Sequence, residues 1–108
     1  MMSKCKRIGD IGEANVIAKL LTYKNVFLSK PIGDNCPYDL IIDVEGRIYR
    51  AQVKTTEKLS RKRMVYYLFT YNSKRKEKKS YNRSEVDLFL FYCMETNYFG
   101  LARVGEIQ

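Results

Sequence analysis

The stretch that decides the fold runs from Tyr38 to Lys54 and reads YDLIIDVEGRIYRAQVK. Two apolar runs flank Glu45-Gly46, and a two-residue loop between Val44 and Arg47 would pair them as an antiparallel hairpin. Because side chains alternate between the two faces of a strand, one face of this hairpin carries only apolar or neutral residues. These are Leu40, Ile42, Val44, Tyr49, Ala51 and Val53. We expect the one-sided burial of that face to set the register.

Three polar side chains gather on the other face of this hairpin. Asp39 lies opposite Gln52, and directly opposed Cβ atoms are ~5 Å apart in an antiparallel pair. Lys54 shares the face of Gln52 because side chains repeat every second residue. An acid and an amide carbonyl at this separation can share one cation, and Mg²⁺ prefers oxygen ligands. The sequence therefore predicts a metal and phosphate site at Asp39, Gln52 and Lys54, with the carbonyl of Val53 as a backbone ligand.

These residue types suit the hydrolysis of a phosphodiester, which needs a Lewis acid, an activated water and a cation near the growing charge. We expect Asp39 to anchor Mg²⁺, with Mn²⁺ as a substitute, and Gln52 to add its amide oxygen. Lys54 would position water or stabilise the phosphoryl charge, and Glu13 would complete the site through water. The chain has no histidine, which excludes His-based triads, His-ligated zinc and His-based ribonuclease chemistry.

Positive charge begins at this site and continues downstream of it. The formal net charge is +8 and the pI is about 9.5. The segment from Lys54 to Arg83 holds eleven Lys or Arg and two Glu, a net charge of +9. Such a concentration fits a polyanionic partner; the alternative is a solvated basic loop. The residues predicted to contact this partner, which the resemblance given below identifies as DNA, are Lys58, Arg61, Lys62, Arg63, Lys74, Arg75, Lys76, Lys78, Lys79 and Arg83.

A length of 108 residues predicts one domain spanning 1–108. Cys5, Cys36 and Cys93 contain no CxxC pair, which argues against a disulfide framework and a zinc site and favours a reducing, cytoplasmic setting. The longest apolar run, Leu88 to Met94, is too short to cross a bilayer, and no apolar stretch follows the basic residues near the N-terminus. We therefore expect neither membrane association nor a targeting segment.

The remaining elements follow from periodicity. Apolar residues recur at three- and four-residue steps over Gly9–Tyr23, which predicts a helix with Asp10 and Glu13 in its first turn. Strands are expected at Val26–Leu28, Met64–Tyr71, Asp87–Met94 and Tyr98–Val104, with a basic loop over Asn72–Arg83. The run Leu88 to Met94 is apolar on both faces, so it is either a central strand covered on each side or an edge buried against another subunit. The aromatic residues of Met64–Tyr71 either pack in the sheet or stack on nucleotides.

Three motifs together resemble the PD-(D/E)XK nuclease superfamily. They are Pro37-Tyr38-Asp39, Gln52-Val53-Lys54 on the next strand, and Gly9-Asp10-Ile11-Gly12-Glu13 on a preceding helix. The resemblance is nearest to intron-encoded homing endonucleases of this fold, which are similar in Gln-x-Lys and in a later strand like Val86 to Tyr92. Archaeal Holliday-junction resolvases are second.

This resemblance implies an α/β (α+β), restriction-endonuclease-like fold, with a mixed β-sheet flanked by helices and Mg²⁺-dependent cleavage of DNA. The implied roles are Glu13 as the helix acid, Asp39 as the principal metal ligand, Gln52 as the variable second ligand and Lys54 as the catalytic lysine. Most of the superfamily has Asp or Glu where this chain has Gln52. Losing one charge weakens Mg²⁺ binding, since Coulomb terms near a protein surface reach ~4 kcal/mol at 4 Å. The helix that usually follows the lysine strand is also hard to find, because Thr55 to Arg63 lacks an apolar stripe.

The sequence thus predicts a metal-dependent endodeoxyribonuclease. One site per chain and two strands to cut predict a homo-oligomer, a dimer or a tetramer, with Leu88 to Met94 as the candidate interface. The alternatives are a resolvase-like structure-specific nuclease, a catalytically silent nucleic-acid-binding module, and a subunit whose aromatic strands serve oligomerisation. Taken one by one, the site residues also have purely structural interpretations: Asp39 would only start a strand or turn, Gln52 and Lys54 would form a solvent face, and Glu13 would serve the helix dipole.

Overall fold

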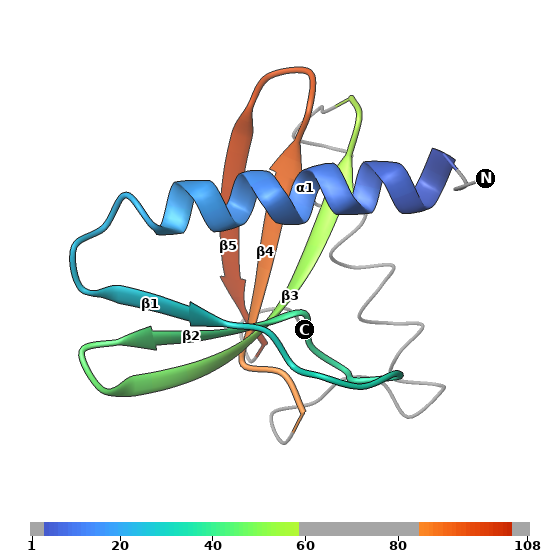
Figure 1. Ribbon diagram of the computed structural model, residues 1–108. Coiled ribbons are helices and arrows are strands. Elements are labelled where there is room, and N and C mark those ends of the chain that lie inside the picture. Colours follow the sequence, from blue (N-terminus) through green and yellow to red (C-terminus); the bar gives the residue numbers. More distant parts are fainter. Residues whose placement is uncertain (1–3, 59–84, 105–108) are drawn as a thin grey trace.

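The computed structural model describes residues 4–58 and 85–104. These residues form one helix, α1 (Lys4–Leu20), and five strands, which are β1 (Val26–Ser29), β2 (Leu40–Val44), β3 (Arg47–Thr56), β4 (Leu88–Cys93) and β5 (Tyr98–Arg103). The strands make a single sheet in the order β1-β2-β3-β4-β5, and α1 lies across one face of it (Figure 1). Neighbouring strands are antiparallel except β3 and β4, which are parallel. The predicted mixed sheet of an α+β fold is confirmed.

The hairpin of β2 and β3 has the register that the sequence predicts. Leu40 pairs with Ala51, and Val44 pairs with Arg47. Both loop residues have positive φ, 53° at Glu45 and 88° at Gly46, as the tight two-residue hairpin turn requires. The amide of Gly46 also donates a hydrogen bond of 2.9 Å to Oδ1 of Asp43. The turn therefore fixes the two strands locally.

The two halves of β3 have different partners. Residues 47–51 pair with β2, whereas residues 51–56 pair with β4. The hairpin of β2 and β3 is strongly turned relative to β4 and β5, and β3 runs through both parts of the sheet (Figure 1). Within the described chain, the ladder between β2 and β3 ends at the pair of Leu40 and Ala51. Beyond that pair, the edge of β3 that faces β2 is open to side chains.

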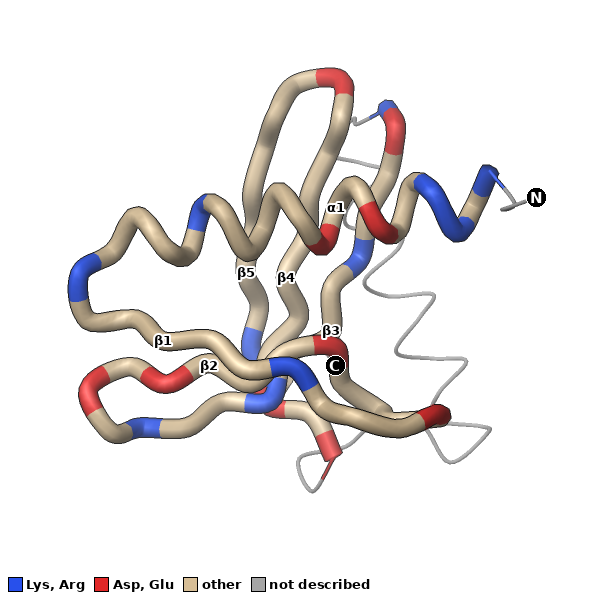
Figure 2. Tube along the Cα trace, viewed as in Figure 1, with Lys and Arg blue, Asp and Glu red and all other residues tan. Residues whose placement is uncertain are grey.

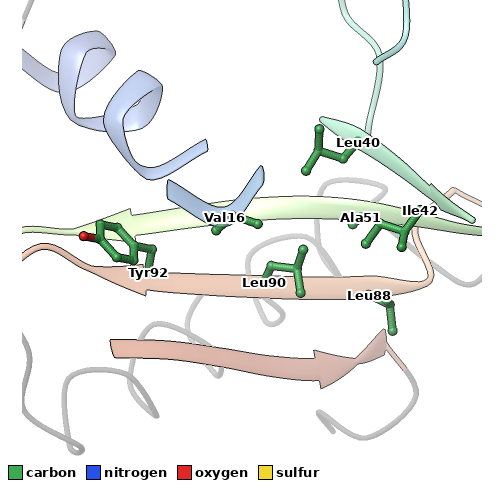
Figure 3. Packing of buried hydrophobic residues seen from close by; sticks show 7 residues of the cluster. All are labelled: Val16, Leu40, Ile42, Ala51, Leu88, Leu90 and Tyr92. Atoms are coloured by element: carbon green, nitrogen blue, oxygen red, sulfur yellow. The ribbon is translucent and has the colours of Figure 1, made fainter. Parts of the chain in front are cut away.

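The core lies between α1 and the sheet. Its buried members, seen in Figure 3, come from α1, the hairpin and β4, and they include the apolar hairpin face predicted from the sequence. The cluster consists of Val16, Leu40, Ile42, Ala51, Leu88, Leu90 and Tyr92. Half-buried Val44, Tyr49 and Val53 pack against it. Burial of this one face explains why the register of the hairpin is unique.

Strand β4 is a central strand. It pairs with β3 on one edge and with β5 on the other, and its six side chains are only 1–8% exposed. Of the two possibilities for Leu88 to Met94, the covered central strand is correct. The prediction that this strand is the interface between subunits is wrong, because both of its edges and both of its faces are already occupied or buried.

Helix α1 starts five residues earlier than predicted, at Lys4 instead of Gly9, and ends at Leu20. Lys and Arg are good helix formers, and Gly9 has no neighbour within 4 Å of where its Cβ would lie, so it is tolerated inside the helix. The prediction that Asp10 and Glu13 lie in the first turn is therefore wrong, since both sit in the middle of α1. No helix in the described part of the chain is long and apolar enough to cross a membrane. The predicted strand Met64–Tyr71 and loop Asn72–Arg83 lie outside the described residues.

Candidate active site

Asp39 stands where β2 and β3 part. Its amide donates to the carbonyl of Ala51 at 2.8 Å, and its Oδ2 accepts a hydrogen bond of 2.8 Å from the amide of Val53. The carboxylate therefore caps the open edge of β3. Backbone groups of alternate residues face the same edge of a strand, so the carbonyl of Val53 faces the edge that Asp39 occupies. The expected role of the Val53 carbonyl as a backbone ligand requires this placement.

The carboxyl group of Asp39 is partly buried, and burial raises its pKa above the ordinary value. The hydrogen bond from Val53 acts in the opposite direction. The negative charge of Glu13 raises the pKa of Asp39 further, while the positive charges of Lys54 and Lys30 lower it. The carboxylate of Glu13 and the ammonium groups of Lys54 and Lys30 therefore lie within electrostatic reach of Asp39. Because burial disfavours the charged form of this carboxylate, a cation beside it is favourable.

Glu13 reaches the site because α1 packs tightly on β3. A Cβ at Gly12 would overlap the side chain of Thr55, so the backbone of α1 lies directly on the strand at this point. Glu13 is the next residue, and its half-buried carboxylate forms an ion pair with Lys30, which follows β1. Figure 2 shows acidic and basic positions together where α1 crosses the sheet. The sequence indicates Glu13 only as part of a motif. The contact between α1 and β3 brings this residue to the hairpin.

Gln52 carries the one buried side-chain oxygen or nitrogen in the described chain that has no hydrogen-bond partner, its Oε1. Leaving such an acceptor unpaired costs about 1–3 kcal/mol, so the group calls for a donor or a cation. In the register of the hairpin Gln52 lies opposite Asp39, one position beyond the pair of Leu40 and Ala51. An unpaired oxygen opposite a carboxylate is what a hard cation needs.

The donors fit an ion that keeps part of its water shell. Among the described residues, no three or more His, Cys, Asp or Glu lie close enough together to hold a metal. The available donors are the carboxylate of Asp39, the amide oxygen of Gln52 and the carbonyl of Val53, with Glu13 in electrostatic reach. Mg²⁺ is usually bound by one or two carboxylates together with water and substrate phosphates. The residues present therefore fit Mg²⁺ better than an ion that needs a full protein cage.

The structure brings some predicted site residues together and leaves others outside its description. Lys54 lies on the same face of β3 as Gln52 and lowers the pKa of Asp39 through its charge. Lys58 is exposed just after β3. The other predicted DNA-contacting residues, from Arg61 to Arg83, lie outside the described residues. The described chain holds eleven Lys or Arg and ten Asp or Glu, so the positive excess comes from residues 59–84.

Sequence reasoning also missed the ion pair between Arg50 and Asp87. The carboxylate of Asp87 accepts hydrogen bonds from the backbone amide of Arg50 at 2.8 Å and from its Nε and Nη2 at 3.1 Å each. The amide of Asp87 returns a bond of 2.8 Å to the carbonyl of Arg50. This clamp joins the start of β4 to β3 two residues before Gln52. No spacing in the sequence indicates this ion pair, because its partners are far apart in the chain. The only signal was Asp87 itself, a charged residue directly before an apolar strand.

A helix laid over a mixed sheet, with Asp39 and a Gln-x-Lys segment where two strands part, is the arrangement that the resemblance to the PD-(D/E)XK class implies. The family model described as PD-(D/E)XK endonuclease matches residues 3–107, and the chain belongs to this family. The predicted superfamily is thereby confirmed.

Among solved structures, the chain is similar to that of a bacterial homing endonuclease, I-Ssp6803I. The TM-score is 0.70 at 22% sequence identity, and the match covers 97% of this chain and 72% of the other. At this identity the likeness shows the fold. No curated protein matches the sequence.

Proposed function

We propose that this chain is a divalent-metal-dependent DNA endonuclease of the homing type, which hydrolyses phosphodiester bonds. The observation that carries the proposal is the position of Asp39. Its carboxylate caps the open edge of β3, where it lies beside the amide of Val53, opposite Gln52 with its unpaired Oε1, and within the electrostatic influence of Lys54. If Asp39 only capped the strand, nothing would account for the buried, unpaired Oε1 of Gln52 opposite it.

Each residue has a distinct task in this proposal. Asp39, the amide oxygen of Gln52 and the carbonyl of Val53 hold Mg²⁺ or Mn²⁺, and Glu13 adds negative charge through a water molecule. The ion, when bound, supplies Lewis-acid stabilisation of the phosphate and lowers the pKa of a bound water. Lys54 contributes a fixed positive charge that stabilises the phosphoryl oxygens or orients the attacking water.

The charge distribution supports DNA as the substrate. The described residues are nearly balanced in charge, whereas residues 59–84 hold nine Lys or Arg against one Glu. Lys58 and the basic residues from Arg61 to Arg83 are proposed to follow the phosphate backbone. Contacts of this kind make affinity fall steeply with salt concentration. A salt titration of DNA affinity tests this part.

Cleavage tests the proposal. Supercoiled plasmid and a four-way DNA junction are incubated with the protein in Mg²⁺, Mn²⁺ or EDTA. We expect metal-dependent cutting that falls by about 10²-fold or more in Asp39→Asn and in Lys54→Met, while both variants still bind DNA. Asp34→Asn and Lys24→Met remove the same charges from exposed positions and serve as matched controls.

No cutting by the unaltered protein with any metal would contradict the nuclease activity and leave a silent binding module. Full activity in both site variants would contradict the site. Preference for the junction over plasmid would favour the resolvase-like alternative.

Because one chain carries one site, cutting both strands of a duplex calls for a homo-oligomer, a dimer or a tetramer. Light scattering at the concentration of the cleavage assay measures the assembly. A monomer that cuts both strands in one encounter would contradict this part of the proposal.

A further inference from the structure

A lysine outside the family motif occupies the acidic side of the site. Lys30 comes directly after β1, and its ammonium group forms an ion pair with the carboxylate of Glu13 on α1. The ion pair joins the edge strand of the sheet to the helix. None of the three motifs includes this residue, and the catalytic scheme gives it no task.

The two partners are unequally exposed. The side chain of Glu13 is 22% exposed, whereas that of Lys30 is 63% exposed. The carboxylate is therefore held by the fold, while the ammonium group reaches it from solvent on a flexible stem. A lysine of this kind can return to water at little cost because its ammonium group is strongly hydrated.

The charge of Lys30 acts on both acids of the site. The hydrogen bond and the charge of Glu13 raise the pKa of Lys30, and the charges of Asp39 and Asp10 add to the effect, so the lysine stays protonated. In the other direction, Lys30 lowers the pKa of Asp39, which Glu13 raises. At Asp39 the charges of Lys30 and Glu13 therefore act in opposite directions.

We propose that Lys30 is a tethered counter-ion, which pairs with Glu13 in the metal-free protein, opposes the binding of a divalent ion and leaves Glu13 when that ion binds. The inference rests on the proposed function, since it concerns the same metal site. Its physical basis is that two cations near the same pair of carboxylates repel each other. The consequence is that the metal affinity of the DNA-free protein is lower than its donors alone would give.

Calorimetric titration of Mn²⁺ into the DNA-free protein tests this. We expect Lys30→Met and Lys30→Gln to bind Mn²⁺ at least about fivefold more tightly than the unaltered protein, because a unit positive charge beside the ion is removed. Lys30→Arg keeps the charge and should change the affinity less than about twofold. Lys24→Met removes one positive charge from an exposed position before β1, and it controls for the change in net charge with an expected shift below about twofold.

A double variant shows whether Glu13 transmits the effect. Combined with Glu13→Gln, the Lys30→Met change should tighten Mn²⁺ binding by clearly less than it does alone, since the pair no longer exists. An equal gain in both backgrounds would overturn the proposed pairing. Unchanged or weaker binding in both Lys30→Met and Lys30→Gln would overturn the inference.

Asp39→Asn separates this inference from the proposed function. If the unaltered protein cuts DNA and binds Mn²⁺ in a manner that depends on Asp39, but loss of Lys30 does not tighten binding, only the counter-ion role fails. If the unaltered protein shows no Asp39-dependent binding of Mn²⁺, the proposed metal site fails, and the role of Lys30 fails with it.

Discussion

Gly12 of α1 lies in direct contact with Thr55 of β3, so closely that a Cβ on Gly12 would overlap the Oγ1, Cβ and Cγ2 atoms of the threonine. Only a residue without a side chain allows the helix to approach the strand at this distance. The contact fixes the distance between α1 and the sheet. It thereby places Glu13, the following residue, within electrostatic reach of Asp39.

Gly12→Ala should lower the free energy of unfolding by about 1–3 kcal/mol, because the added methyl group must push α1 away from β3. Gly9→Ala, in the same helix, should raise it by about 0.5–1 kcal/mol, since nothing lies within 4 Å of the new Cβ. Urea unfolding of the two variants measures both effects. Cleavage should also fall in Gly12→Ala, as Glu13 is displaced. Equal stabilities in the two variants would refute the close contact.

Gln52→Met should separate stability from activity. Replacing the buried, unpaired amide oxygen by an apolar group of similar length should raise the free energy of unfolding of the metal-free protein by about 1–2 kcal/mol. The same change removes a predicted metal ligand, so Mn²⁺ binding and DNA cleavage should be lost. Urea unfolding in EDTA and calorimetry with Mn²⁺ provide the two measurements. A joint loss of stability and activity would mean that Gln52 has a structural role alone.

Asp87→Ala should destabilise the fold in a manner that depends on pH. Arg50 lowers the pKa of Asp87 in the folded protein through a side-chain hydrogen bond, a backbone hydrogen bond and its charge. A carboxyl group with a lowered folded pKa stabilises the protein above its unfolded pKa, and this contribution is lost as the pH falls through the folded value. The variant should therefore cost about 1–3 kcal/mol near pH 7 and progressively less below about pH 4.

Urea unfolding of Asp87→Ala at several pH values checks this course. Glu95→Ala, which removes an exposed carboxylate between β4 and β5, is the matched control and should show little change at any pH. A cost that stays constant down to acid pH would show that the carboxylate charge of Asp87 is not what joins β4 to β3.

The hairpin was predictable in detail because its causes are local. The apolar alternation of both strands and the Glu45-Gly46 turn lie within a few residues of each other, and they determine the pairing of Leu40 with Ala51. Because Asp39 precedes Leu40 and Gln52 follows Ala51, that pairing also places Asp39 opposite Gln52. The start of α1 was predicted less well, since Gly9 resembles a helix boundary in the sequence but is tolerated inside the helix, where no other residue crowds it.

The candidate site divides in the same way. By itself, the sequence determined the hairpin, the spacing of Asp39, Gln52 and Lys54, and the family they indicate, because these depend on strand periodicity and a short turn. Only the tertiary structure decided that Glu13 meets Lys30, that β4 is interior rather than an interface, and that Asp87 clamps Arg50. Those relationships join residues distant in the chain, and they arise from the packing of α1 on the sheet and from the parallel pairing of β3 with β4, which no local pattern encodes.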